Sequence, residues 1–126
     1  MKVSFDFDST LDRIDVQEFA HNLIKNGVEV WICTSRFSPE NAHRKDWNDD
    51  LFAVASKVGI PKDRVIFTNM ANKSEVIKDM GFIWHLDDDW IELDFINADT
   101  KTKGISVFGQ NNWMNKCIKL LNENKL

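Results

Sequence analysis

The stretch VEVWICT at residues 28–34 constrains the fold of this chain more than any other segment. For most of its length it is apolar on both faces, which is typical of a central strand that helices cover on each side. A strand of this kind predicts a parallel sheet. Shorter apolar runs predict further strands at 2–7, 64–68, 82–86 and 105–108.

Helical patterns alternate with these runs along the chain. Apolar residues recur at helical spacing in 15–26, 51–58 and 112–124. A further helix is expected to begin near Asn72 or Lys73 and to end at Gly81, whereas residues 89–103 show no pattern that assigns them. The alternation predicts a three-layer, doubly wound α/β sheet of about five strands, with its site at the carboxyl ends of the strands.

The length of 126 residues and the hydrophobic content of 43% predict a single domain over residues 1–126. The net charge of -4 argues against strong nonspecific binding to nucleic acid. No apolar run approaches the about 20 residues that span a bilayer, and the first residues lack a secretory pattern, so we expect a cytoplasmic protein without a membrane partner. Cys33 and Cys117 are too few and too far apart for a disulfide framework, and we expect them to be reduced.

Acidic side chains gather where the predicted strands end. Asp6 and Asp8 close the first strand, and residues two apart in an extended chain share a face. Their charges repel one another unless a cation lies between them. Two other strand ends bring polar residues to the same edge of the sheet: Thr34, Ser35, Asp87 and Asp88.

Four motifs in this order make the pattern specific. They are DFDST, ICTS, a lysine at the start of a helix, and HLDDD. The chain thereby resembles the haloacid dehalogenase superfamily of phosphohydrolases. The resemblance implies the strand order 5-4-1-2-3 and a Mg²⁺-dependent phosphatase that hydrolyses phosphate monoesters through an aspartyl-phosphate.

The resemblance also implies roles for the acidic residues. Asp6 would be the nucleophile, and Asp8 the general acid that protonates the leaving oxygen and then activates water. Because an anionic nucleophile must approach an anionic substrate, Mg²⁺ is the expected cofactor. Its ligands would be the Asp6 carboxylate, the Asp8 carbonyl and Asp87, with Asp88 in support or in its place. A solvated turn or a calcium loop is the alternative explanation for Asp6 and Asp8.

Four further residues are candidates to bind the phosphoryl group. Thr34 corresponds to the second motif, with Ser35 as the competing register. Arg36 is expected either to bind phosphate with two hydrogen bonds or to form a surface salt bridge. Lys73 is expected to neutralise Asp6 and the phosphoryl group. The alternative lysines are Lys62 and Lys78.

The spacing of the motifs leaves no room for a cap domain. The helix at 15–26 follows the first motif almost at once, and the residues between Ser35 and Lys73 are used by sheet and helix. The family commonly has glycine where this chain has Ser9. We therefore predict a capless enzyme, whose open site suits a bulky or polymeric substrate such as a phosphorylated nucleic-acid end, or else relies on a partner for closure. The expected substrate is a phosphorylated small molecule or such a nucleic-acid end.

Other interpretations remain beside this one. The chain is alternatively a catalytically silent binding or regulatory domain, although a mere metal binder has no need of the second acid, Asp8. A receiver domain is disfavoured because the strand at 64–68 ends in Thr68 and not in aspartate. Ordinary packing is favoured over base stacking for Trp47, and over a catalytic role for His85. Asp89 is expected to cap the turn that follows it.

Overall fold

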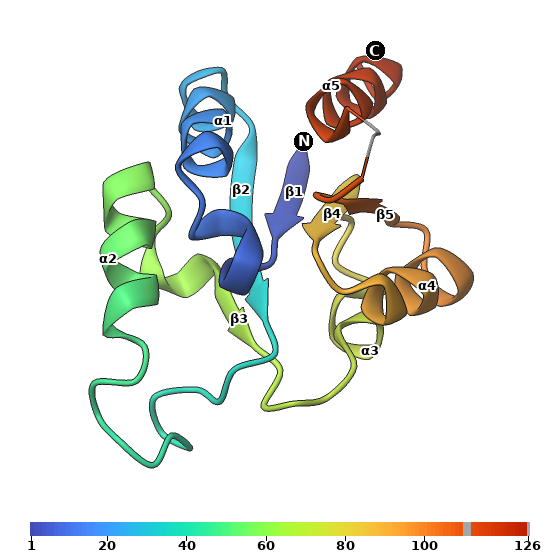
Figure 1. Cartoon of the computed structure of the whole chain (residues 1–126). Coiled ribbons are helices and arrows are strands. Elements are labelled where there is room, and N and C mark those ends of the chain that lie inside the picture. The colour runs from blue at the N-terminus through green and yellow to red at the C-terminus, as the bar shows by residue number, and fades with distance from the viewer. Residues whose placement is uncertain (110–111, 126) are drawn as a thin grey trace.

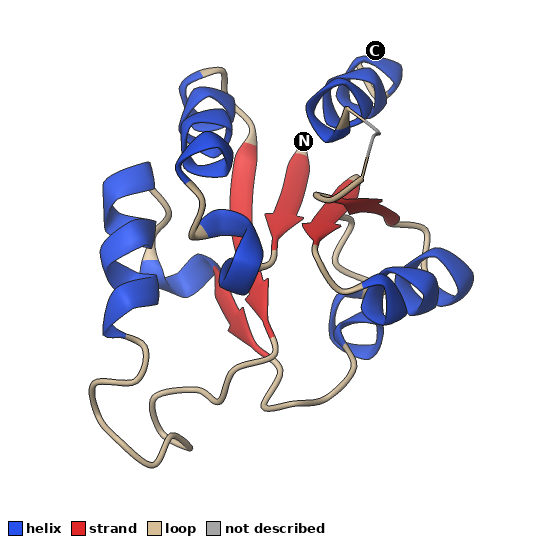
Figure 2. Ribbon diagram, in the orientation of Figure 1, coloured by secondary structure: helices blue, strands red, loops and turns tan. Residues whose placement is uncertain are grey.

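Five parallel strands form the centre of the molecule in a computed structural model that describes residues 1–109 and 112–125. The strands are β1 (Lys2–Phe5), β2 (Glu29–Thr34), β3 (Val65–Phe67), β4 (Trp84–Asp87) and β5 (Lys103–Ser106). Their order in the sheet is β3-β2-β1-β4-β5, which places β1 in the middle (Figures 1 and 2). The predicted fold class and strand order are confirmed, since 5-4-1-2-3 is the same order taken from the other edge.

Helices cover both faces of the sheet. On one face lie α1 (Ile14–Lys25), α2 (Asp49–Val58) and α5 (Trp113–Glu123), and on the other lie α3 (Lys73–Ile77) and α4 (Trp90–Asp99). Two short turns complete the elements, η1 (Phe7–Leu11) and η2 (Lys62–Arg64). The described residues contain no cap domain, because η1 leads into α1 after two residues.

The larger part of the core lies between the sheet and α1, α2 and α5. Phe5 of β1 packs edge-on against Trp84 of β4, with ring centroids 5.3 Å apart. Phe19 of α1 meets Trp113 of α5 at 5.2 Å, which ties the C-terminal helix to this face. Full burial of an apolar side chain of this size contributes about 1.5–3 kcal/mol, so these rings hold the sheet and its helices together.

Several boundaries differ from those predicted. The first strand ends at Phe5 and not at residue 7, because the carbonyl of Asp6 already accepts the N–H of Leu11 in a turn. The last strand begins at Lys103, two residues before the predicted 105–108. At Gly104 a β-carbon would lie 2.9 Å from Leu93 Cδ2, so this glycine allows β5 to approach α4 closely.

The segment 89–103, which no sequence pattern assigned, contains α4. Asp89 caps this helix, since its carboxylate accepts the backbone N–H groups of Ile91 and Glu92. The predicted cap at Asp89 is thereby confirmed. In residues 1–109 and 112–125, no helix has the length and apolar character that crossing a membrane requires.

Candidate active site

The carboxyl ends of β1 and β4 bring two aspartates together. Asp6 directly follows β1, and its backbone N–H donates to the carbonyl of Leu86 in β4 at 2.8 Å. Asp87 is the last residue of β4. Asp6 and Asp87 are 5% and 0% exposed. Because burial removes water from carboxylates, these two groups need partners of opposite charge or protons.

Lys73 supplies that positive charge. It is the first residue of α3 and is 2% exposed, and its Nζ lies 3.0 Å from Asp6 Oδ1 and 2.5 Å from Asp87 Oδ2. The backbone N–H of Lys73 donates to Glu92 Oε2 at 2.9 Å, which fixes the start of α3 against α4. Among the three candidate lysines it is therefore Lys73 that reaches the acids. Lys62 and Lys78 are both exposed.

Asp87 is held on both of its oxygens. Oδ1 accepts the N–H of Asp89 at 3.0 Å, and Oδ2 contacts His85 Nε2 at 2.7 Å in addition to Lys73. His85 Nδ1 in turn lies 2.8 Å from Ser4 Oγ. Burial lowers the pKa of His85, so the ring is neutral and donates from Nε2 to Asp87 while Nδ1 accepts the Ser4 hydroxyl.

His85 is packed as predicted, yet it also belongs to the site. It is fully buried and touches an acid of the cluster, a contact that the sequence interpretation did not include. The usable signal was its spacing, because residues two apart on a strand share a face and His85 precedes Asp87 by two. Glu92 was also missed, since it lies in the segment that no pattern assigned.

Asp6, Asp87 and Asp88 form a cluster suited to a divalent cation. One carboxylate oxygen from each lies within 4.8 Å of the others. Lys73 compensates one of the three negative charges, and a divalent cation would neutralise the two that remain. An all-oxygen donor set is the kind that Mg²⁺ prefers over softer metals. The residues therefore fit Mg²⁺.

The acids of this cluster do not ionise alike. Burial, followed by the charge of Asp87, raises the pKa of Asp6 to about 9. Burial also acts to raise the pKa of Asp87, but hydrogen bonds from His85 and Lys73, together with the charge of Lys73, outweigh it and hold that pKa below its usual value. Of these two close carboxylates with one cationic partner, Asp6 is therefore the one that takes a proton more readily.

Asp8 lies outside this cluster and pairs with Arg36. The guanidinium donates Nε–H and Nη2–H to the two Asp8 oxygens at 3.0 and 2.7 Å. It also donates to both oxygens of Asp50 at 2.8 and 3.0 Å, and to the carbonyl of Trp47 at 3.2 Å. These five bonds match the five N–H donors of arginine. Of the two predictions for Arg36, the ion pair is the one seen, and phosphate binding would require Arg36 to exchange a partner.

The end of β2 provides a buried hydroxyl. Thr34 is fully buried as the last residue of β2, and its Oγ1 accepts the backbone N–H of Arg36 at 3.2 Å. The hydroxyl keeps its own hydrogen for another acceptor. Ser35, the competing register, is half-buried, and its carbonyl accepts the N–H of Met70. The predicted binding of phosphate by either residue stays a prediction.

The turn after β1 contains a residue with left-handed backbone geometry. Ser9 adopts a left-handed conformation with φ of 61°, at the position where the resembled family commonly has glycine. Its backbone N–H donates to Asp12 Oδ2 at 3.1 Å, which helps to hold this conformation.

Among the described residues, Thr10 Oγ1 is the one buried side-chain polar atom without a hydrogen-bond partner.

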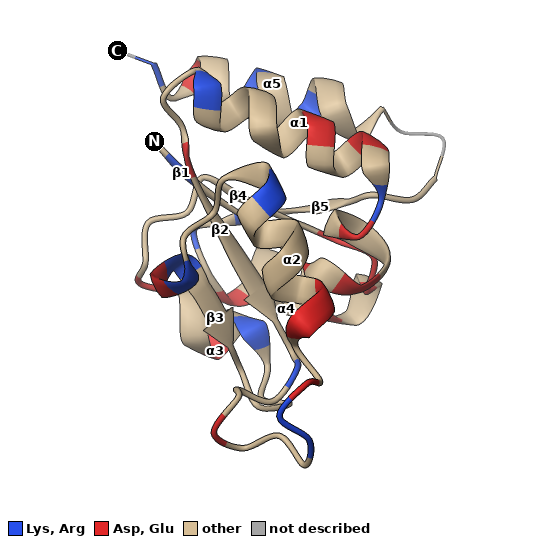
Figure 3. Cartoon of the chain, turned by 90° about the vertical axis from the view of Figure 1, so that its left-hand side faces the viewer, with Lys and Arg blue, Asp and Glu red and all other residues tan. Residues whose placement is uncertain are grey.

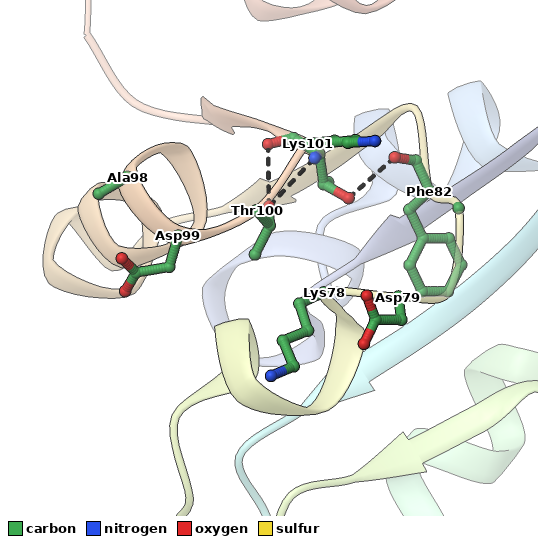
Figure 4. A pocket seen from close by; sticks show the side chains of 9 residues that line it. Lys78, Asp79, Phe82, Ala98, Asp99, Thr100 and Lys101 are labelled. Atoms are coloured by element: carbon green, nitrogen blue, oxygen red, sulfur yellow. Dashed lines mark hydrogen bonds between the residues drawn. The ribbon is translucent and has the colours of Figure 1, made fainter.

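Open space near the site is found beside Arg36. A cavity of about 220 Å³ is lined by Arg36, Phe37, Trp47 and Asn48. A larger cavity of about 580 Å³ lies at the other end of β4, where its walls include Lys78, Phe82 and Thr100 (Figure 4). The larger cavity shares no residue with the acidic cluster. We therefore place the candidate site by its charged side chains and not by the volume of the nearest cavity.

Comparison with models of known protein families gives no match, and a search of curated proteins gives none either.

Proposed function

We propose that this protein is a Mg²⁺-dependent phosphatase that hydrolyses phosphate monoesters through a phosphorylated Asp6. The observation that carries the proposal is the contact between Asp6 and Lys73 within reach of Asp87 and Asp88. The Asp6 carboxylate lies beside the fixed positive charge of Lys73 and beside two further acids, Asp87 and Asp88, with which it could hold a cation. The arrangement agrees with the resemblance to haloacid dehalogenase phosphohydrolases, of the capless kind.

In the first step, a carboxylate oxygen of Asp6 attacks phosphorus, and the bond from phosphorus to the leaving oxygen breaks. Asp8, protonated after it is released from Arg36, gives its proton to that oxygen, so the alcohol leaves in its neutral form. In the second step, Asp8 takes a proton from water as the water oxygen attacks phosphorus. The bond between phosphorus and Asp6 breaks, and inorganic phosphate and the Asp6 carboxylate are restored.

The surrounding residues stabilise the charge that the phosphoryl group carries. The Lys73 ammonium faces Asp6 from a buried position, where an electrostatic contact is worth more than in water. The Thr34 hydroxyl, at the end of β2, would donate to a phosphoryl oxygen. Bound by Asp6, Asp87 and Asp88, and by the carbonyl of Asp8, Mg²⁺ would offset the repulsion between the nucleophile and the phosphate.

The expected substrate is a phosphorylated small molecule or the phosphorylated end of a nucleic acid. The absence of a cap among the described residues leaves the strand ends accessible to a bulky leaving group. Acidic and basic residues both occur in the long loop after β2, without a run of one sign (Figure 3). Such a surface supports recognition of one phosphate and not of a long backbone. We place the protein in the cytoplasm, in keeping with its free cysteines.

The test is hydrolysis of p-nitrophenyl phosphate with and without Mg²⁺ by the parent and by Asp6→Asn. We expect the parent to turn over the substrate only when Mg²⁺ is present. We expect the variant to lose turnover, because asparagine keeps the size of the side chain but not its nucleophilic charge. Asp99→Asn, on an exposed residue at the end of α4, is the matched control. Equal rates in parent and Asp6→Asn would instead indicate a silent binding or regulatory domain.

A further inference from the structure

We propose that the cavity beside Arg36 is a leaving-group subsite that takes a planar heteroaromatic ring, such as the base of a nucleotide. This inference rests on the proposed function, because it assigns the part of the substrate that leaves. The walls of the cavity are formed by residues of the loop between β2 and α2: Arg36, Phe37, Trp47 and Asn48.

The position of the cavity follows from the role of Asp8. A group that protonates the leaving oxygen must lie beside it, so the leaving alcohol extends from Asp8. The Asp8 carboxylate is directed at Arg36, with Oδ1 2.7 Å from Nη2. Arg36 is itself a wall of the cavity. A nucleoside whose oxygen meets Asp8 would therefore pass over the guanidinium and place its base in the cavity.

The chemistry of the walls suits a flat ring. Phe37 and Trp47 are 40% and 45% exposed, so both rings are accessible to a ligand that enters the cavity. His43 packs edge-on against Trp47, with centroids 5.6 Å apart and planes at 79°, and so supports the indole from one side. Aromatic rings and a guanidinium plane are the surfaces on which bases stack.

The size of the cavity limits what it can hold. Its volume of about 220 Å³ lies below the range of about 300–1,000 Å³ that is usual for drug-sized ligands. It therefore admits one ring system and not several stacked bases. A nucleoside monophosphate and the terminal nucleotide of an oligonucleotide both meet this condition.

The loop that forms the cavity is already fixed. The carbonyl of Trp47 accepts from Arg36, and the carbonyl of Phe37 accepts from Asn48 Nδ2 at 3.0 Å. At the start of the loop, the N–H of Ser38 donates to Asn69 Oδ1 at 2.9 Å. A preorganised wall loses little conformational entropy when a ring binds.

The first experiment compares kcat/KM for a nucleoside monophosphate with kcat/KM for glycerol phosphate, which has no ring. We expect Trp47→Ala to lower the ratio about tenfold, which corresponds to about 1.4 kcal/mol and lies within the range for stacking of one base. Trp47→Phe should keep most of the ratio, and Phe95→Ala, an exposed ring on α4, should keep all of it. An unchanged ratio in Trp47→Ala, with its thermal unfolding like that of the parent, would overturn the proposal.

A second experiment separates the subsite from the catalytic proposal. Binding of an unphosphorylated nucleoside to Asp6→Asn is followed by NMR titration, and Trp47→Ala in that background should abolish it. If no substrate is turned over but this Trp47-dependent binding is seen, the catalytic proposal fails and the subsite stands. If turnover is normal and no nucleoside binds, the subsite fails alone. Comparing kcat/KM for a 5′-phosphorylated oligonucleotide with kcat/KM for the mononucleotide shows whether the base of a nucleic-acid end or that of a free nucleotide is preferred.

Discussion

The ammonium group of Lys73 lies 3.0 Å from the carboxylate of Asp6, although 67 residues separate them in the chain. Both side chains are almost completely buried, so the ion pair between them replaces the hydration that each group has in water. Four predictions concern this pair and the groups around it.

The first prediction concerns the charge of Lys73. Lys73→Met keeps most of the side-chain volume but leaves Asp6 and Asp87 without their cation. Removing one partner of a buried pair costs about 3–5 kcal/mol, and we expect a loss at the lower end of this range because Asp6 can take a proton. Urea unfolding without Mg²⁺ measures the loss. Lys78→Met, on an exposed residue of the same region, should change stability by no more than about 0.5 kcal/mol.

The second prediction concerns cation binding. Mg²⁺ should raise the unfolding temperature of the parent, because a ligand that binds the folded state stabilises it. Asp88→Asn should reduce this rise, since it removes a carboxylate of the cluster. Asp89→Asn is the control, because asparagine also caps helices and residue 89 caps α4. An equal rise in both variants would remove Asp88 from the metal site.

The third prediction concerns the thiol of Cys33. Burial raises the pKa of Cys33 to about 12, and the residue is fully buried in β2. Because the thiolate is the reactive form, a raised pKa slows alkylation at pH 8, and the rate should rise with pH up to that value. Mass spectrometry after iodoacetamide treatment should find Cys33 unmodified in the native protein and modified in urea. Equal labelling of the native and unfolded forms contradicts the burial of this thiol.

The fourth prediction concerns the hydrogen bonds of His85. His85→Phe fills a similar volume but leaves Ser4 and one contact of Asp87 without a partner. An unsatisfied buried polar group costs about 1–3 kcal/mol, and we expect a loss of this size in urea unfolding. His43→Phe, on the exposed loop, tests the same change away from the core. If the two variants are equally stable, the hydrogen bonds that link Ser4, His85 and Asp87 contribute nothing to the free energy of unfolding.

The sequence predicted the sheet because its strands are distinct apolar runs, of which VEVWICT is the clearest. It did not predict α4, because apolar residues on that helix do not all face inward. Ile91 and Phe95 are 50% and 42% exposed, while Leu93 and Ile96 are buried. Such a helix has no single apolar face, so periodicity cannot reveal it.

The sequence predicted that Asp6, Asp87, Asp88 and Lys73 would lie together, but it did not predict that Asp8 would pair with Arg36. Asp6 and Asp87 follow from strand ends, because the topology alone brings neighbouring ends together. Lys73 was preferred over Lys62 and Lys78 from its place at the start of a helix, and the structure does bring Lys73 to Asp6 and Asp87. The partners of Arg36 were hidden, since Asp50 approaches it only after the loop has folded back.

The full set of hydrogen bonds on Arg36 has a consequence for how a substrate would arrive. A guanidinium with every donor occupied has none to spare for an incoming anion. A phosphate ester could recruit it only by displacing a carboxylate, and Asp8 is the one in the turn that follows Asp6, the proposed nucleophile. That exchange would release the Asp8 carboxylate to take up a proton from water and then pass it to the departing alcohol, so that arrival of the substrate would also prepare the acid.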